Sequence, residues 1–281
     1  MKLASVYIGG VPRAVEVVDD NRVALTDYSD VADLLRKSPL RNRTTRGEVV
    51  ENSDVQFRPV LPRPGKIICV GLNYKTHIIE MKRELPRYPT LFAKFSNALI
   101  GPQDDIQLPA ESDCLDWEVE LAFVIGERVR RVNEHRGLDA IAGYTIMNDI
   151  TARDWQNRTP QWLQGKTFES TTPLGPWMVT ADEISDPNSL DISCTINNTY
   201  VQQSNTSDLL HQPGDLVSYI SQICTLEPGD VIATGTPGGV GSGRTPPWYL
   251  SPGDVVTSSI AGIGTMTNTC VIEDQENPSW A

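Results

Sequence analysis

Two glutamates lie two residues apart in an otherwise apolar segment, DCLDWEVELAFVI at 113–125. In a β-strand successive side chains point to opposite faces, so Glu118 and Glu120 would share one face, with roughly 6.5–7 Å between their Cα atoms. Trp117 and every second residue after it are apolar and form the predicted core face. Two carboxylates at this spacing can converge on one cation. The alternative is an acidic pair on a solvated strand edge.

A third carboxylate follows a second apolar strand, in AGYTIMNDITARDW at 142–155. Asp149 stands where this strand ends and a polar turn begins, a position at which aspartate also serves as a turn or helix-cap residue. Three carboxylates with water suit Mg²⁺ or Mn²⁺ better than softer metals. The chain has three histidines, no HExxH motif and no paired cysteines, which argues against zinc.

A lysine and a histidine–glutamate pair are further candidates for chemistry. Lys166 lies in WLQGKTFESTTPLGPW at 162–177. Beside a metal it could bind a substrate carboxylate or stabilise an enolate, whereas alone it would be an ordinary solvated lysine. His77 and Glu80 are three residues apart, so they would face the same side of a short helix. Such a pair can deprotonate a water, although exposed pairs of this kind are also common on surfaces.

A glycine-rich loop is expected after a later strand, in VIATGTPGGVG at 231–241. Its threonine hydroxyls and backbone N–H groups can face an anion. The alternative is an ordinary glycine-rich turn.

Composition limits the partners of the protein. The 281-residue chain has a formal charge of −12 and a pI near 4.7, which argues against nucleic acid or an anionic membrane as a partner. No stretch approaches the roughly 18 apolar residues of a membrane span, and the N-terminus lacks the pattern of a secretory signal. We therefore expect a cytoplasmic protein whose five cysteines are reduced.

The pattern of apolar residues predicts a strand-dominated α+β fold in two parts. Residues 1–60 are interpreted as a small N-terminal α+β domain, with short strands and a helix in SDVADLLRK capped by Ser29. The polar segment 40–56 is interpreted as a connector, and the catalytic domain is expected to cover 61–281. Within the catalytic domain, helices are predicted at 75–84, 134–142 and 207–224.

Taken together, these motifs resemble the fumarylacetoacetate hydrolase superfamily. The similarity runs from about residue 66 to about residue 271, through GLNYKTHIIEM, PTLFAKFSNALIGPQDDIQLP, LDWEVELAFVIG, AGYTIMNDITARDWQ, GKTFESTTPLGPW, GDVIATGTPGGVG and GIGTMTN in that order. The chain looks like the branch that contains acylpyruvate hydrolases and 2-hydroxyhepta-2,4-diene-1,7-dioate isomerases. The resemblance implies a rolled, mixed β-sheet that encloses one divalent metal, Mg²⁺ or Mn²⁺, in a homodimer.

The resemblance also implies roles for individual residues. The metal ligands would be Glu118, Glu120 and Asp149. The catalytic residues would be Lys166, together with His77 and Glu80 on a mobile lid. The substrate-binding residues would be Tyr74, Arg153, Gln156 and Thr236. One departure is Glu169, where the family pattern usually has aspartate, and this implies a rearranged environment around the lysine.

The function implied by the resemblance is that of a metal-dependent hydrolase, which cleaves a C–C bond in a 2,4-dioxo acid, an acylpyruvate such as fumarylpyruvate. Glu80 with His77 would activate water for attack at C4, and Lys166 with the metal would stabilise the departing pyruvate enolate. One alternative is decarboxylation of oxaloacetate, or decarboxylation or isomerisation of a 2-hydroxymuconate-type diacid in aromatic catabolism. Another is a catalytically silent, metal-dependent binding protein. The expected ligand is a small anionic 2-oxo acid in each case.

Overall fold

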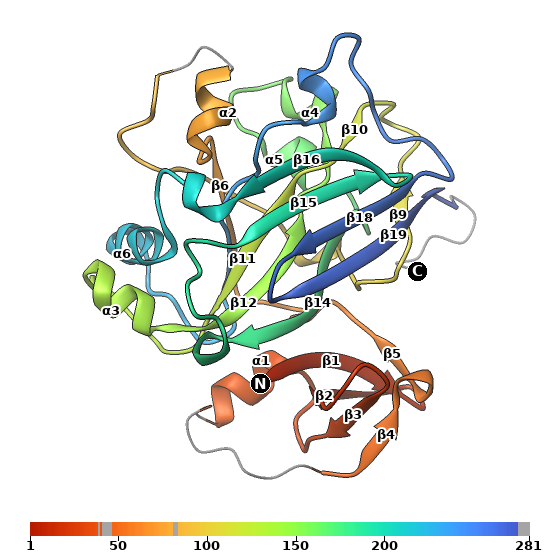
Figure 1. Ribbon diagram of the computed structural model, residues 1–281, viewed down its shortest axis with the longest axis vertical. Helices are drawn as coiled ribbons and strands as arrows, with labels where there is room; N and C mark the ends of the chain where they lie inside the picture. The colour runs from red at the N-terminus through yellow and green to blue at the C-terminus, as the bar shows by residue number, and fades with distance from the viewer. Residues whose placement is uncertain (39, 41–46, 81–83, 275–281) are drawn as a thin grey trace.

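The computed structural model describes residues 1–38, 40, 47–80 and 84–274, and β-strands dominate it (Figure 1). Its largest sheet has twelve strands. The first strand of the chain, β1 (Lys2–Ile8), belongs to this sheet because it pairs antiparallel with β14 (Thr172–Thr180). The N-terminal strands therefore continue the same sheet that carries the central strands, and the predicted strand-dominated α+β fold with mixed sheets is confirmed.

The strands fall into three sheets. Across the largest sheet the order is β4 (Val49–Glu51), β3 (Arg22–Leu25), β2 (Val11–Val17), β1, β14, β12 (Ile141–Asn148), β11 (Val119–Ile125), β17 (Val231–Ala233), β6 (Ile67–Gly71) and β7 (Thr90–Ala93), with β5 (Val55–Phe57) on β1 and β8 (Leu99–Ile100) on β14. The second sheet runs β16 (Thr199–Asn205), β15 (Asp191–Ile196), β18 (Val255–Ile260), β19 (Gly264–Ile272) and β9 (Ile106–Leu108). The third is the pair β10 (Leu115–Asp116) and β13 (Thr151–Ala152).

The helices in the described ranges are short. They are α1 (Val31–Lys37), α2 (Lys75–Glu80), α3 (Glu134–Asp139), α4 (Arg153–Gln156), α5 (Leu163–Lys166) and α6 (Pro213–Ile223). Single 3₁₀ turns occur at η2 (Asn52–Asp54), η3 (Ser96–Ala98), η4 (Ala181–Glu183), η5 (Thr206–Asp208) and η6 (Gly241–Gly243).

Three local predictions were wrong. The N-cap of α1 is Asp30 rather than Ser29, because the Asp30 side chain accepts the backbone N–H of Asp33 at 2.7 Å. The helix predicted at 207–224 begins only at Pro213, after the turn η5. The segment 40–56, predicted as a connector, contains β4 and the beginning of β5 in its described part. These strands form because β4 pairs with β3 and β5 pairs with β1.

Strand β11 is buried on both faces. On one face, Leu121 and Phe123 pack in a core that also contains Cys194 of the second sheet. On the other face, Ala122 and Val124 pack in a core that also contains residues of α1. This two-sided burial explains why the segment stays apolar after its glutamates. It also rules out the solvated-edge interpretation of the acidic pair, since the glutamates are buried as well.

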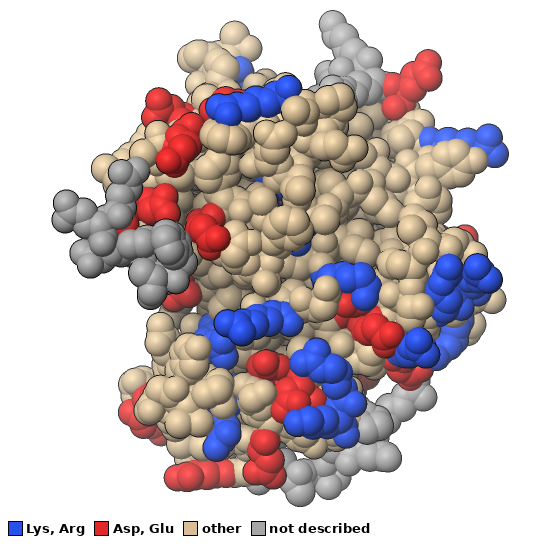
Figure 2. All heavy atoms as spheres, turned by 180° about the vertical axis from the view of Figure 1, so that it is seen from behind, with Lys and Arg blue, Asp and Glu red and all other residues tan. Residues whose placement is uncertain are grey.

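The surface opposite the view of Figure 1 carries charges of both signs. Lys and Arg side chains are interspersed with Asp and Glu there, and a broad uncharged area lies above them (Figure 2). This face therefore lacks the single-sign field that would steer a polyanion. Among the described residues, no helix is long and apolar enough to cross a membrane. All five cysteines are free thiols.

Close contact between β12 and β14 depends on Gly143. A Cβ at this position would overlap the carbonyl oxygen of Val179 and lie 2.8 Å from Met178 Cγ. We predict that Gly143→Ala lowers the free energy of unfolding by about 2 kcal/mol, because backbone atoms cannot move aside cheaply. Gly243→Ala is the control, since its Cβ would meet Val240 Cγ2 at an ordinary 3.6 Å. Urea unfolding measures both variants, and equal stabilities would contradict the prediction.

Candidate active site

Three acidic side chains converge at the centre of the large sheet. Glu118, Glu120 and Asp149 each offer a carboxylate oxygen within 4.8 Å of the others, and all three residues are buried. Glu118 immediately precedes β11, Glu120 lies in β11, and Asp149 immediately follows β12. Because β11 and β12 are antiparallel, with Val119 opposite Asn148, the beginning of one strand adjoins the end of the other. The predicted convergence of the three carboxylates is thus present in the structure.

Asn148 fixes the backbone on which these carboxylates sit. Its Oδ1 accepts the backbone N–H of Glu118 at 2.8 Å, and its Nδ2 donates to Ser258 Oγ at 2.9 Å. The backbone N–H of Asp149 in turn donates to the Glu118 carbonyl at 2.8 Å. Asn148 therefore joins the acidic centre to the second sheet. Its position at the end of a wholly apolar strand was the only sequence signal for this role.

Two buried lysines neutralise part of the acidic charge. Lys166 Nζ donates to Glu118 Oε2 and to Asp149 Oδ2, at 2.7 Å each. Lys94 Nζ lies 2.9 Å from Asp149 Oδ1 and donates to Thr172 Oγ1 at 2.7 Å. Both lysine side chains are at most 2% exposed. Sequence reasoning missed Lys94, although a lysine directly after the apolar run PTLFA was a usable signal.

The protonation states follow from burial and from these contacts. Burial, together with the charges of Asp149 and Glu118, raises the pKa of Glu120 well above its usual range. Burial would also raise the pKa of Asp149, but the ammonium groups of Lys166 and Lys94 outweigh it and lower that pKa. Burial opposes the charge of Lys166, yet Asp149 and Glu118 raise its pKa above the ordinary value. Without a bound cation, these two carboxylates therefore favour the ammonium form of Lys166.

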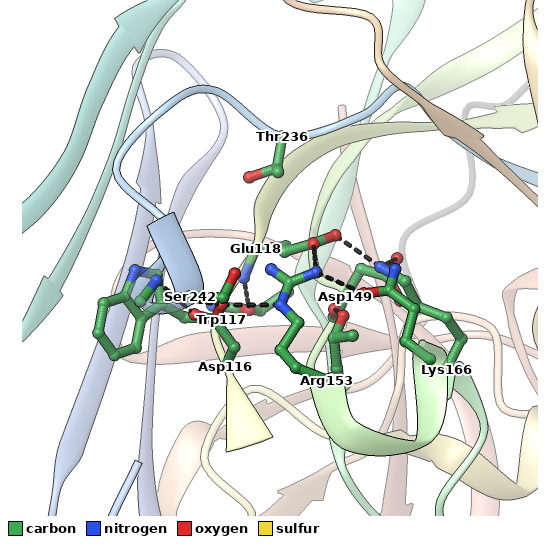
Figure 3. A network of polar contacts seen from close by, with 12 residues as sticks. Asp116, Trp117, Glu118, Asp149, Arg153, Lys166, Thr236 and Ser242 are labelled. Atoms are coloured by element: carbon green, nitrogen blue, oxygen red, sulfur yellow. Dashed lines mark hydrogen bonds and ion pairs between the residues drawn. The ribbon is translucent and has the colours of Figure 1, made fainter. Parts of the chain in front are cut away.

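Arg153, predicted to bind substrate, lies beside Glu118 and Asp149 (Figure 3), and Gln156, also predicted to bind substrate, is hydrogen-bonded to it. Arg153 Nη1 forms an ion pair with Glu118 Oε1 at 2.7 Å and donates to Gln156 Oε1 at 3.0 Å. Its Nε donates to Asp116 Oδ2 at 2.8 Å. Its Nη2 is buried and has no hydrogen-bond partner in the described structure. The guanidinium thus keeps one nitrogen available for a ligand.

Thr236 lies at the start of the glycine-rich loop, close to the acidic centre. Its hydroxyl donates to the Val119 carbonyl at 3.0 Å and accepts from Gln202 Nε2 at 2.8 Å. The neighbouring Gly235 N–H donates to Glu120 Oε2 at 2.9 Å, and its φ of +96° suits glycine. The Thr236 hydroxyl proton is already used within the protein, so the hydroxyl offers a ligand only an acceptor.

The beginning of α2 is docked against the segment that contains η5. Tyr74 is fully buried and forms a bridge with Leu209, and its hydroxyl has no hydrogen-bond partner in the described structure. Burial and the charge of Glu120 raise the pKa of that hydroxyl. The backbone N–H of Thr76 donates to Asp208 Oδ2 at 3.1 Å. His77 and Glu80 lie in α2, but their side chains are outside the described part of the structure.

The centre fits a hard divalent cation. Its converging donors are all carboxylate oxygens, the type that Mg²⁺ and Mn²⁺ prefer. Asp149 Oδ1 is buried and, within the described residues, is approached by Lys94 Nζ at 2.9 Å as an ion pair without a further hydrogen-bond donor. Formally, the four buried carboxylates, those of Asp116 and the three converging residues, outnumber the three buried cations by one charge. A divalent cation would make the centre net positive and suitable for an anionic substrate.

A buried centre of three converging carboxylates flanked by two buried lysines is typical of an enzyme active site. Residues 66–271 match the family described as "Fumarylacetoacetate (FAA) hydrolase C-terminal". The chain belongs to the fumarylacetoacetate hydrolase family, as its motifs indicated.

Several curated relatives of the chain are named oxaloacetate tautomerases, and others are named only fumarylacetoacetate hydrolase domain-containing proteins. The chain is 46% identical over 224 residues to a mitochondrial oxaloacetate tautomerase of Rattus norvegicus, covering 79% of this chain and 72% of the relative. It is 43% identical over 225 residues to a mitochondrial oxaloacetate tautomerase of Homo sapiens, covering 79% and 72%. Since these relatives are mitochondrial proteins, the expected cytoplasmic location is not confirmed.

Solved structures of the family match nearly the whole chain. A 5-carboxymethyl-2-hydroxymuconate delta-isomerase from Mycobacterium smegmatis is 35% identical with a TM-score of 0.83, covering 97% of this chain and 100% of that chain. A fumarylacetoacetate hydrolase from Exiguobacterium antarcticum is 33% identical with a TM-score of 0.87, with the same coverage. The names of relatives and neighbours support the isomerase alternative better than the acylpyruvate hydrolase prediction.

Replacing Glu120 should separate the loss of stability caused by its buried charge from the contribution of its carboxylate to metal binding. We predict that Glu120→Gln abolishes Mn²⁺ binding in calorimetry. In the presence of a chelator at pH 7, the variant should melt at or above the wild-type temperature. The raised pKa means that ionised Glu120 costs stability above the unfolded pKa, and the neutral amide removes that cost while still accepting the Gly235 N–H. A chelated variant less stable than chelated wild type would contradict this.

Proposed function

We propose that the protein is a divalent-metal-dependent isomerase that interconverts the keto and enol forms of a 2-oxo dicarboxylic acid of the oxaloacetate class. The observation that carries the proposal is the convergence of three carboxylates beside Lys166, whose Nζ donates to two of them, Glu118 and Asp149. Such a centre favours negative charge developing on a substrate oxygen. The tautomerase and isomerase relatives support this reaction class.

The metal would be held by Glu118, Glu120 and Asp149. When bound there, Mg²⁺ or Mn²⁺ would act as a Lewis acid on the 2-oxo oxygen of the substrate. Lys166 uses two of its three N–H donors on Glu118 and Asp149 within the described structure. Its third donor is available to the substrate oxygen, where it would stabilise an enolate more strongly than a ketone.

Arg153 and Gln156 would orient the substrate. The two N–H groups on Arg153 Nη2 are buried and unpaired within the described residues, and a carboxylate is the ligand that satisfies them. The Gln156 amide is held against the same guanidinium. A substrate with a carboxylate next to its oxo group would then be fixed in one orientation.

The isomerisation moves one proton off C3 and places one on the C2 oxygen, so it needs no water and no second substrate. We assign the proton transfer at C3 to Glu80 with His77, a carboxylate–imidazole pair of the kind that transfers protons, because Lys166 is engaged as a donor to Glu118 and Asp149. The Tyr74 hydroxyl is buried and its pKa is raised, so it stays protonated and is a candidate donor to the oxygen.

Hydrolysis of an acylpyruvate stays a prediction. It would use the same enolate stabilisation but also needs an attacking water at C4, and nothing in the described residues identifies a site for that water. Decarboxylation of oxaloacetate likewise passes through an enolate and is the second candidate within the same chemistry. We further propose that the enzyme is a homodimer that acts on small anionic 2-oxo acids.

The reaction class is tested by a substrate panel. We predict that the protein with Mg²⁺ or Mn²⁺ accelerates loss of the ultraviolet absorbance of enol-oxaloacetate without stoichiometric release of CO₂. Excess chelator should abolish this activity, and re-added metal should restore it. Faster turnover of fumarylpyruvate or acetylpyruvate than of oxaloacetate would instead support the hydrolase prediction, and stoichiometric CO₂ would support the decarboxylase.

The base is tested separately. We predict that Glu80→Gln slows tautomerisation by roughly 10²–10⁴, the usual contribution of a general base. Binding of oxalate to the Mn²⁺-loaded protein should stay near the wild-type value, because the carboxylate centre is unchanged. Glu84→Gln is the control, since Glu84 is an exposed acid four residues along the chain. Wild-type rates for Glu80→Gln would show that proton transfer at C3 uses another group.

A further inference from the structure

Asp116 is an acidic residue of the site that does not join the convergent carboxylates. It ends β10, two residues before Glu118, and its side chain is fully buried. The metal-type cluster contains Glu118, Glu120 and Asp149 but not Asp116. The Asp116 carboxylate must therefore have other polar partners, since burying a carboxylate without partners is costly in free energy.

Among the described residues, the Asp116 carboxylate accepts hydrogen bonds from two other segments, and Arg153 and Ser242 are seen beside it in Figure 3. Its Oδ2 accepts Arg153 Nε–H at 2.8 Å and the backbone N–H of Ser242 at 2.9 Å. Its Oδ1 accepts the backbone N–H of Gly241 at 2.7 Å. Asp116 thus joins α4, through Arg153, to the turn η6 of the glycine-rich loop.

The loop side of this contact is closely fitted. A Cβ on Gly241 would lie 2.9 Å from Asp116 Oδ1 and would overlap the carbonyl oxygen of Trp248. The backbone of η6 can therefore approach the carboxylate only because residue 241 is glycine. The loop is held against Asp116 by two backbone bonds rather than by a side chain that could rotate away.

The arginine side of the contact fixes which nitrogen is free. A guanidinium has five N–H donors in a planar fork. Nε is directed at Asp116, and Nη1 is directed at Glu118 and Gln156. Nη2 is left buried and unpaired within the described residues. With two carboxylates bound along two edges of the plane, the guanidinium cannot turn, so the remaining pair of N–H groups keeps one direction.

We infer that Asp116 is a positioning residue, which presents Arg153 Nη2 to a carboxylate of the substrate and makes that presentation depend on the seated glycine-rich loop. This inference rests on the proposed function, because it takes the substrate to be an anion bound by Arg153. The inference goes beyond the proposed function because it names the residue that orients the arginine. Asp116 acts through Arg153 and touches neither metal nor substrate.

The chemistry requires a carboxylate at this position. The three groups that face it are all N–H donors, and a carboxylate accepts from all of them. Asparagine has nearly the same shape but only one acceptor oxygen, so its amide N–H₂ would face either Arg153 or the η6 backbone. Asp116→Asn therefore breaks one arm of the contact without leaving a cavity.

The test measures ligand binding to the full-length protein loaded with Mn²⁺. We expect Asp116→Asn to weaken oxalate binding in calorimetry by at least about tenfold, the order expected for losing a charge-assisted hydrogen bond. The Mn²⁺ dissociation constant should stay within about threefold, because the three ligands are untouched. The KM for oxaloacetate should rise more than kcat falls. Asp154→Asn is the control, because it makes the same substitution at the next residue of α4 after Arg153. The Asp154 carboxylate accepts a hydrogen bond from Ser112 Oγ at 2.6 Å.

A double-mutant cycle separates positioning from a merely structural role. In an Arg153→Gln background, Asp116→Asn should weaken oxalate binding by less than about twofold, because its effect is transmitted by the arginine. Additive losses would overturn the inference, and so would wild-type oxalate affinity in Asp116→Asn alone. If Asp116→Asn does not fold, as judged by circular dichroism, Asp116→Ser gives the same comparison. Failure of wild-type protein to bind oxalate or turn over oxaloacetate would instead reject the proposed function.

Discussion

The site depends on one costly arrangement, the burial of several carboxylates within a few ångströms of one another. In water such groups repel weakly, but in the interior of a sheet their repulsion and their lost hydration both grow. The fold offsets this with Lys166, Lys94 and Arg153, whose charges are themselves buried. The balance is incomplete, since Glu120 keeps a raised pKa. A divalent cation would offset the excess negative charge and leave the centre net positive.

The antiparallel pair β11 and β12 makes this arrangement possible. It brings the start of one strand beside the end of the other, so Glu120 and Asp149, 29 positions apart, meet although residues 126–140 with α3 connect the two strands. Asn148 then ties the junction to the second sheet through Ser258. Because both faces of β11 are packed, neither strand can shift register without burying the wrong side chains. The rigidity of the centre follows from the core rather than from the metal-type ligands.

The local part of this site could be predicted from sequence, and the non-local part could not. Side-chain alternation places Glu118 and Glu120 together, and a strand end indicates Asp149, because both signals lie within a few residues. The contact of Asp116 with Gly241 spans 125 residues, and that of Lys94 with Thr172 spans 78. No periodicity reports such pairings. The Ser29 cap failed for a related reason, since two adjacent cap residues compete and only the backbone geometry chooses Asp30.

The same centre can serve several reactions, because the residues that would bind the oxo-acid end of the substrate do not depend on which bond is broken or formed. In the proposed function, Lys166, Arg153 and the carboxylates would act on the oxo-acid end of a substrate, and an enolate at that end is common to isomerisation, decarboxylation and C–C hydrolysis. What differs is the group that delivers or removes a proton at the neighbouring carbon. We assign that group to α2, whose first turn is attached by Thr76 to Asp208. On this proposal the fold separates the buried binding centre from the element that would select the reaction.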